Sequence, residues 1–332
     1  MRNRQRFPRS IVPVATTLAA ALVLAACTSS SSGNGSATDA SSKPTSASPT
    51  PTDSNAAAAN AAPVHVSLLE GDGGVYGVGM PIIAYFTKRV TDAKAFESAV
   101  KVSVNGQPAS GAWYWEKSGH RGTPVEAHYR LKDYWPANAK IQVDLPLKGL
   151  SAGVGLAYDD NLTLSISTGD AHVSTVDCAA ERMTVTSNGK QVRTMPTSCG
   201  KATTPTYTGT KVVMQKGENL PGSSKLRPDG AVEMRGTDPS DRYDLIVPWS
   251  VRLTASGEYA HAASWNGGNI GVRSTSNGCT NLNESDAKWF YAFSQIGDVL
   301  TYANTGGKRM PSWDGYGDWN LTWSAWTTGG LL

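Results

Sequence analysis

The stretch MTVTSNGKQVRTM, residues 183–195, holds two short alternating runs on either side of an Asn-Gly pair. Asn188 and Gly189 form the dipeptide most typical of a two-residue hairpin turn, because both positions of that turn take positive φ. The stretch therefore predicts strands over 183–186 and 191–195. Together with 34 Gly and 18 Pro in 332 residues, the hairpin favours a mainly β fold.

The same hairpin suggests how two of the four cysteines pair. Cys178 and Cys199 are equally distant from the turn centre between residues 188 and 189. If pairing continues in register, they lie opposite each other at a Cα separation of roughly 4.5–5.5 Å, which a disulfide can bridge. We expect that disulfide. The alternative is two buried free thiols, if the register is lost beyond Met183, and either arrangement leaves Cys279 unpaired.

The N-terminus has the pattern of an export signal. Four arginines precede an apolar run over residues 11–26 that is short for a membrane span. We therefore predict that residues 1–26 form a lipoprotein signal peptide. The run ends in Leu-Ala-Ala-Cys27, which resembles a bacterial lipobox and implies a lipid anchor on Cys27; two acyl chains suffice for stable anchoring. The alternative is an ordinary secretory signal followed by a chance cysteine.

Residues 27–63 are rich in Ser, Thr, Ala and Pro and contain almost no large apolar side chain. Such a segment cannot bury enough surface to fold, so we predict a disordered tether with a reach of about 30–35 Å. The expected location is the outer face of the cell membrane, reaching into the wall. The formal charge is +3, and removing the four signal arginines leaves 3 − 4 = −1. This balance gives no reason to expect a nucleic-acid partner.

Residues 64–168 contain seven short strand-like runs, which predict an antiparallel immunoglobulin-like β-sandwich. Asn105 and Gly106 fit a hairpin turn, and the absence of cysteine excludes the antibody-type disulfide. Trp113 and Trp115 alternate, so we expect one in the core and the other exposed; glycan binding is the alternative role. The runs are His65–Leu69, Met80–Phe86, Val100–Val104, Ala112–Trp115, Ala127–Leu131, Ile141–Leu145 and Leu162–Ile166.

Residues 169–305 read as a second, mainly β domain with one short helix. Helical spacing of Trp289, Phe290, Phe293 and Ile296 predicts a helix capped by Asn283 or Ser285 and ended by Gly297. Residues 306–332 form an extension with four tryptophans, which we expect to pack on this second domain; a glycan-stacking patch is the alternative. The further strands that we expect are Lys211–Met214, Leu245–Leu253, Glu258–His261 and Val299–Ala303.

An unpaired thiol and an imidazole carry the chemistry. Cys279 lies in SNGCTNL, residues 276–282, and His261 lies 18 positions upstream. A neighbouring imidazole can accept the thiol proton and lower the thiol pKa from about 8.5, and Gly278 permits a turn whose N–H groups face an oxyanion. A single cysteine in an exported protein, or a single histidine, more often has a structural role than a catalytic one. The remaining histidines, at 65, 120, 128 and 172, have no comparable partner in the sequence.

Several motifs in order resemble those of L,D-transpeptidases of the actinobacterial type, with a YkuD-type catalytic domain behind an immunoglobulin-like domain. They are His261 followed by 14 residues and SNGCTN (276–281), MPTS (195–198), TPTYTG (204–209), ESDAKWFY (284–291) and GYGDWN (315–320); GAWYW (111–115) and YWPA (134–137) resemble the preceding domain. The resemblance covers about residues 64–328. It implies an all-β catalytic domain.

The resemblance also implies the roles of the site residues. Cys279 is implied as the nucleophile that attacks a tetrapeptide stem before its terminal D-alanine, with His261 as the base. Gly278 and Cys279 would supply the oxyanion donors within the motif that includes Ser276 and Asn277. The implied partners are peptidoglycan stem peptides, a donor tetrapeptide and an acceptor diaminopimelate amine, and the expected product is a 3→3 cross-link made by a monomer.

A substrate pocket is implied next to these residues. It would include Tyr243, Met234, Asn281 and Trp265, with Met234 under a mobile Gly/Pro-rich lid over residues 215–242. Two positions depart from the family pattern. Asn277 replaces a second histidine, and Ala262 stands where a serine is frequent, so a backbone carbonyl would have to orient His261.

Three functions remain open at this point. The first is the transpeptidase; the second is an L,D-carboxypeptidase, in which water deacylates the same acyl-enzyme; and the third is a non-catalytic wall-binding lipoprotein, suggested by Asn277 and Ala262. No phosphate loop, dinucleotide fingerprint or metal-ligand cluster is present in the sequence pattern. We therefore expect neither a cofactor nor a metal.

Overall fold

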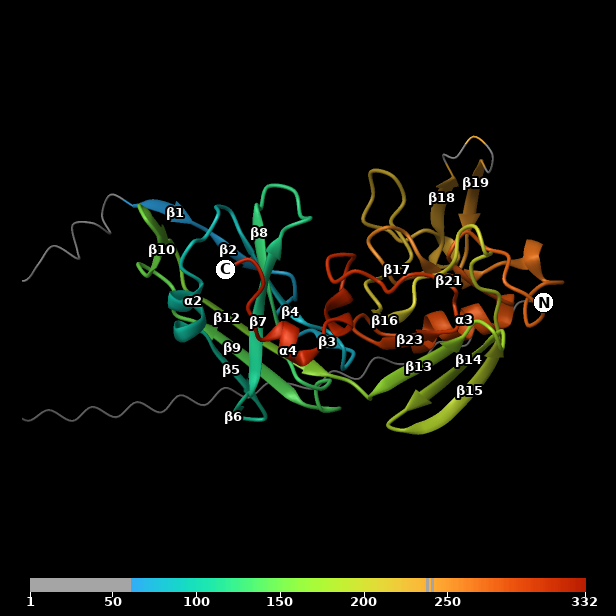
Figure 1. Ribbon diagram of the computed structural model, residues 1–332, viewed down its shortest axis with the longest axis horizontal. Helices are drawn as coiled ribbons and strands as arrows, with labels where there is room; N and C mark the ends of the chain where they lie inside the picture. Colours follow the sequence, from blue (N-terminus) through green and yellow to red (C-terminus); the bar gives the residue numbers. More distant parts are fainter. Residues whose placement is uncertain (1–60, 237–238, 240–241) are drawn as a thin grey trace, which may run out of the picture. The chain divides into compact units, whose positions relative to one another are not determined.

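The structure is a computed structural model that describes residues 61–236, 239 and 242–332 (Figure 1). The predicted signal peptide, the lipidation site Cys27 and almost all of the tether lie outside the described residues. Within the described part, no helix is long and apolar enough to cross a membrane. The first strand begins at Ala62, so the last two residues of the segment predicted as tether belong to the folded chain.

The N-terminal part is a β-sandwich with all seven predicted strands present. Its sheets have the orders β2-β4-β8-β7, β3-β12-β9-β5-β6 and β1-β11-β10. The strands are β1 (Ala62–Val64), β2 (Val66–Leu68), β3 (Val75–Tyr76), β4 (Ile82–Phe86), β5 (Lys101–Val104), β6 (Gln107–Pro108), β7 (Gly111–Lys117), β8 (Val125–Leu131), β9 (Lys140–Leu145), β10 (Ser151–Gly153), β11 (Leu156–Tyr158) and β12 (Leu162–Thr168).

Aromatic side chains fill the space between the two larger sheets. Phe96 lies on α2 (Ala93–Ala99), a helix that the sequence analysis missed, and its ring is 5.1 Å from that of Trp113 and 5.3 Å from that of Trp115. Both tryptophans are buried, so the expectation that one would be exposed is wrong. Residues two apart on a strand point to the same face, so Trp113 and Trp115 on β7 are buried together.

The second part combines a five-stranded sheet of order β15-β14-β13-β23-β16, a four-stranded sheet of order β17-β20-β21-β22, and the hairpin β18-β19. Strands β13, β17, β18 and β22 were not predicted, and the run predicted over 245–253 is two strands. The elements are β13 (His172–Asp177), β14 (Arg182–Ser187), β15 (Lys190–Pro196), β16 (Gly209–Val212), β17 (Gln215–Lys216), η1 (Pro228–Gly230), β18 (Val232–Gly236), β19 (Tyr243–Val247), β20 (Val251–Arg252), β21 (Tyr259–Ala262), η2 (Ser264–Asn266), β22 (Thr280–Leu282), α3 (Glu284–Phe293) and β23 (Val299–Ala303).

One hydrophobic core joins these two larger sheets to α3. Met183 and Leu300 from the first sheet, Ala260 and Leu282 from the second, and Phe290 from the helix belong to one buried cluster. The helix ends at Phe293, where the extended backbone of Ser294 stops it, and not at Gly297 as predicted. Asn283 is the N-cap residue, although its side chain makes no capping hydrogen bond.

The predicted disulfide is present. Cys178 and Cys199 are bonded with their Cα atoms 5.7 Å apart. The symmetric register that suggested the pair is not maintained, because β14 and β15 shift by one residue between Val185 and Thr186. Cys178 follows the end of β13 and Cys199 follows β15, so turns rather than a continuous ladder bring the two sulfurs together.

The extension over 306–332 contacts both parts of the folded chain, which corrects the expectation that it packs on the second domain alone. Asn320 of η3 (Gly317–Asn320) donates to the carbonyl of Thr210 at 2.7 Å, in the second domain. Trp326 of α4 (Trp323–Trp326) is fully buried and donates to the carbonyl of Ala112 at 2.9 Å, on β7. For Trp326, packing therefore replaces the alternative of an exposed glycan patch.

Candidate active site

His261 and Cys279 come to the same cavity because two short strands run parallel. β21 and β22 pair so that His261 lies beside Asn281, two residues after Cys279. Both side chains line one cavity of about 280 Å³. Its other walls come from the β18–β19 hairpin, the segment between β15 and β16, the stretch between β21 and β22, and β22 itself: Met234, Tyr243, Leu245, Val247, Lys201, Trp265, Asn266, Thr275, Ser276, Asn277 and Asn281.

A backbone carbonyl orients the imidazole. Nδ1 of His261 is 2.8 Å from the carbonyl oxygen of Ala262, which can only accept, so Nδ1 carries the proton and Nε2 keeps its lone pair. The side chain is buried and its ring lies 6.0 Å from that of Trp265 at an interplanar angle of 25°. Burial lowers the pKa of His261 to about 4, so the ring is a neutral base at pH 7.

The thiol of Cys279 is held in its protonated form. Burial raises the pKa of Cys279 to about 11, against a smaller lowering effect of a hydrogen bond from the Tyr259 backbone, and the charge of Glu258 raises it further. The sulfur lies 3.8 Å from the carbonyl oxygen of Gly257, to which the thiol donates. The expectation that His261 lowers this pKa stays a prediction, and burial acts in the opposite direction. Both shifts favour the neutral thiol and the neutral imidazole at pH 7.

The turn that carries Cys279 is closed by the side chain of Ser276. Its hydroxyl donates to the carbonyl of Cys279 at 2.5 Å and accepts the N–H of Gly278 at 3.2 Å. Gly278 has φ +116°, a conformation that a side chain would strain. Because the Gly278 N–H is already engaged, this conformation does not offer it to an oxyanion as the sequence analysis expected. The N–H of Cys279 is left as the backbone donor in the motif.

The disulfide and the TPT motif hold this turn from behind. The carbonyl of Cys199 accepts the N–H groups of Thr275 and Ser276, each at 2.9 Å. The hydroxyl of Thr206 donates to the carbonyl of Gly278 at 2.8 Å. Neither segment was expected from the sequence to lie beside the nucleophile. The predicted disulfide between Cys178 and Cys199 was the signal in the sequence that could have indicated this support, because a disulfide fixes the backbone of Cys199.

Asn277 faces away from this support. Its side chain is exposed and its Oδ1 accepts a hydrogen bond from the hydroxyl of Thr204 at 3.2 Å. Asn277 also lines the cavity, and its hydrogen bond to Thr204 anchors the turn that carries Cys279. The two departures from the family pattern, Asn277 and Ala262, therefore leave the orientation of His261 intact.

The expected pocket residues all line the cavity. Met234 on β18 pairs with Leu245 on β19, and Tyr243 shares a face of β19 with Leu245. Met234 is thus part of the covering hairpin, whereas the sequence analysis had placed it beneath a loop lid over 215–242. Asn281 is buried and its N–H and carbonyl pair with Ser198, while Trp265 is 56 % exposed at the rim.

A buried ion pair that the sequence analysis missed lies behind the nucleophile. Lys211 is fully buried, its ammonium contacts the carboxylate of Glu258, and it lies 3.7 Å from the ring centroid of Tyr302. The second carboxylate oxygen of Glu258 accepts the N–H of Tyr207 at 2.7 Å. The two charges act on the Cys279 thiol in opposite directions, since Lys211 lowers its pKa and Glu258 raises it.

Comparison with known proteins agrees with this geometry. Two family models match the chain, one described as a bacterial Ig domain over residues 32–151 and one as the L,D-transpeptidase catalytic domain over residues 171–301. L,D-transpeptidase 1 of Mycobacterium tuberculosis is 31 % identical over 239 residues, which are 72 % of this chain and 84 % of that protein. The chain belongs to the L,D-transpeptidase family.

Other members of the L,D-transpeptidase family show the same relationship. L,D-transpeptidase 2 of M. tuberculosis is 32 % identical over 81 % of this chain, which spans 64 % of that relative's length. The structure of an L,D-transpeptidase from Mycobacterium smegmatis covers 73 % of this chain and all of its own, with a TM-score of 0.56 and 27 % identity. An L,D-transpeptidase solved in complex with imipenem also has a TM-score of 0.56, at 28 % identity over 71 % of this chain and 97 % of its own.

We predict that the Cys279 thiol of this family member alkylates slowly at neutral pH. A pKa near 11 instead of 9 leaves about 100-fold less thiolate at pH 7. The rate with iodoacetamide, followed by intact mass, should keep rising from pH 9 to pH 11, and the unfolded chain in urea should titrate near pH 8.5. A midpoint below pH 7 in the folded protein would instead show a thiolate–imidazolium pair.

We further predict that Lys211→Met costs about 3–5 kcal/mol in the free energy of unfolding, measured by urea denaturation. The substitution leaves the Glu258 carboxylate buried without its cation. Lys211→Met/Glu258→Gln should recover most of this loss, because neither charge then remains. Lys190→Met, at an exposed lysine, is the matched control and should change stability by less than about 0.5 kcal/mol. Equal losses in the single and double variants would refute the ion pair.

Proposed function

We propose that this protein is an L,D-transpeptidase that forms 3→3 cross-links between peptidoglycan stem peptides through an acyl-enzyme on Cys279. The observation that carries the proposal is the placement of Cys279 and the free Nε2 side of His261 on one cavity of about 280 Å³. A nucleophile and an oriented base beside an open pocket are the parts that acyl transfer needs.

The first half of the reaction makes the thioester. The Cys279 sulfur attacks the carbonyl between the third stem residue and the terminal D-alanine while Nε2 of His261 takes the thiol proton. His261 then returns that proton to the departing amine of D-alanine as the C–N bond breaks. Because both groups start neutral, charge develops only in the transition state, where the Cys279 N–H can stabilise the oxyanion.

The second half transfers the acyl group. The side-chain amine of an acceptor diaminopimelate attacks the thioester, His261 removes the amine proton, and the proton returns to the departing sulfur. Attack by water instead would give a tripeptide and make the protein an L,D-carboxypeptidase. The β18–β19 hairpin supports transfer over hydrolysis, since Met234, Leu245 and Val247 give this side of the cavity an apolar wall.

A non-catalytic wall-binding protein is the remaining alternative, suggested in the sequence by Asn277 and Ala262. The carbonyl of Ala262 accepts from His261 at 2.8 Å, so the missing serine hydroxyl is not needed for orientation. The Asn277 side chain bonds to Thr204 and not to the base. These contacts support a competent site.

The test is incubation of the purified protein with tetrapeptide stems, followed by mass spectrometry of the products. We expect cross-linked dimer and free D-alanine, and a covalent adduct when a carbapenem is added. Cys279→Ala should lower dimer formation by at least about 10³-fold and abolish the adduct, since the nucleophile is removed.

The other possible outcomes of this experiment distinguish the alternative functions. Tripeptide without dimer would identify the carboxypeptidase. A folded wild-type protein that gives neither product nor adduct would support the non-catalytic alternative. Dimer formation by Cys279→Ala equal to the wild type would overturn the proposal.

For the location, we propose an extracytoplasmic protein anchored to the outer face of the membrane through a lipid on Cys27. The support is the sequence pattern, Leu-Ala-Ala-Cys after a short apolar run. In a bacterial host, Cys27→Ser should move the exported protein from the membrane fraction to the soluble fraction on blots. Ser31→Ala, four residues further along, is the matched control. Equal membrane association of the Cys27→Ser and wild-type proteins would refute the anchor.

A further inference from the structure

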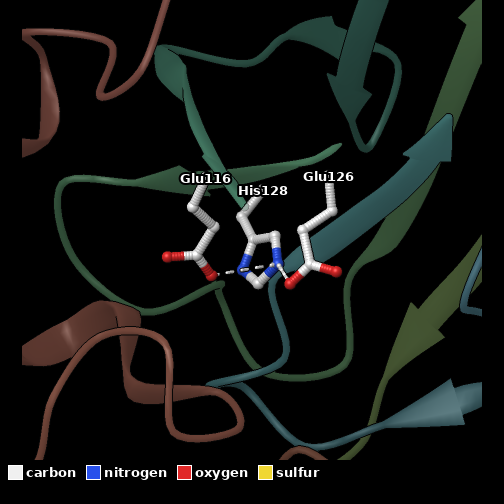
Figure 2. A group of neighbouring side chains, drawn as sticks. All are labelled: Glu116, Glu126 and His128. Carbon is white, nitrogen blue, oxygen red and sulfur yellow. Dashed lines mark hydrogen bonds and ion pairs between the residues drawn. The ribbon is translucent and has the colours of Figure 1, made fainter. Parts of the chain in front are cut away.

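A histidine and two glutamates gather on one sheet face of the immunoglobulin-like domain, far along the chain from Cys279. Glu116 on β7 and Glu126 on β8 are directly opposite in the strand register, and His128 follows Glu126 by two residues on the same face. Figure 2 shows the His128 imidazole between the two carboxylates. Like charges placed opposite each other on adjacent strands are destabilising. A cation between them removes that repulsion.

The spacing of the three groups suits a small metal ion. Nε2 of His128 is 3.3 Å from Oε1 of Glu126 and 3.7 Å from Oε1 of Glu116, and the three atoms lie within 4.8 Å of one another. A tetrahedral zinc ion with bonds of about 2.0–2.2 Å separates its ligand atoms by roughly 3.3–3.5 Å. An ion at the centre therefore needs only small movements of the two glutamate side chains.

A further carboxylate holds the imidazole in the orientation that a metal requires. Asp318 in the C-terminal extension lies with its Oδ1 2.7 Å from Nδ1 of His128. Nδ1 donates to Asp318, and Nε2 faces the two glutamates and is hydrogen-bonded to Glu126, so a metal ion on Nε2 would take the place of its proton. Histidine ligands of metals commonly donate their second ring nitrogen to a carboxylate in this way. The hydroxyl of Ser118 fixes Glu126 similarly, donating to its Oε2 at 2.5 Å.

The carboxylate of Glu116 has no hydrogen-bond donor among the described residues, although the residue is only 8 % exposed. The other oxygen of Asp318, Oδ2, is also buried without a partner. The nearby guanidinium of Arg130 donates to the carbonyls of Leu131 and Leu321. Three carboxylates thus lie around one imidazole and the Arg130 guanidinium, whose charge acts on Asp318, so even a protonated ring leaves an excess of up to about one negative charge.

We propose that Glu116, Glu126 and His128 bind a divalent transition-metal ion, Zn²⁺ in preference to Mg²⁺ or Ca²⁺, with Asp318 as the positioning residue behind His128. One imidazole nitrogen and few ligands favour zinc, whereas the all-oxygen sites of Mg²⁺ and Ca²⁺ need about six. Because the ligands lie on β7 and β8 and Asp318 lies in the extension, the ion would fasten the C-terminal extension to the immunoglobulin-like domain. The sequence pattern did not indicate this site because strand pairing brings Glu116 opposite Glu126, and Asp318 lies 190 residues from His128.

The test measures Zn²⁺ binding to the full chain carrying Cys279→Ala, which removes the thiol as a competing ligand. Equilibrium dialysis with elemental analysis should show one Zn²⁺ per chain, and Co²⁺ in its place should give the intense visible absorption of a four-coordinate ion. Zn²⁺ should also raise the melting temperature. This readout is independent of transpeptidase activity, so failure of either proposal leaves the other standing.

The ligand variants are nearly isosteric and keep the side-chain volume. Glu116→Gln should weaken Zn²⁺ binding by at least about 100-fold, because it removes a charged ligand. Asp318→Asn should weaken it by about 10–100-fold, which is the usual loss in metal affinity when the carboxylate behind a histidine ligand is removed. Asp144→Asn, at an exposed carboxylate of β9, is the matched control and should bind as the parent does. Circular dichroism confirms folding of each variant.

Two outcomes overturn the proposal. Less than about 0.1 Zn²⁺ per folded parent chain would show that His128 is a protonated ring held by carboxylates. Equal affinity in the parent, Glu116→Gln and Asp318→Asn would show an adventitious ion only.

Discussion

The parallel pairing of β21 with β22 is the constraint on which the proposed chemistry depends. It places His261 beside Asn281 and so brings the imidazole to the turn that ends in Cys279. Two strands of three and four residues cannot hold such a register alone. The Cys199 carbonyl fixes the turn from one side, and Phe290 of α3 packs beneath the same sheet.

Burial shifts the pKa values of His261 and Cys279 toward their neutral forms, in the direction opposite to a thiolate–imidazolium pair. The His261 pKa is lowered and the Cys279 pKa is raised by the same cause, exclusion of water. A neutral thiol is also protected from adventitious oxidation, which requires thiolate character. The buried pair of Lys211 and Glu258 adds a balanced charge behind the sulfur, so the local field stays small until substrate carries charge into the cavity.

Two of the buried charge clusters among the described residues differ in balance. Lys211 and Glu258 match one positive charge with one negative charge, and the remaining oxygen of Glu258 is satisfied by a backbone N–H. Around His128, carboxylates outnumber cations, and Glu116 has no donor. Since burying an unmatched charge is costly, a further cation would stabilise the second cluster, whereas the first is already balanced. That difference motivates a metal at one site only.

The sequence by itself determined the class of fold and the family, because alternation, turn residues and motif spacing are local properties. It also predicted the pairing of Cys178 with Cys199, although turns and not the expected register bring the two together. It misjudged what depends on surroundings: the bulge near Val185 and the end of α3. It also missed Lys211 with Glu258 and the partners of His128. Only the tertiary structure decided these, because solvent exclusion and charge pairing arise between residues that meet across strands and are distant along the chain.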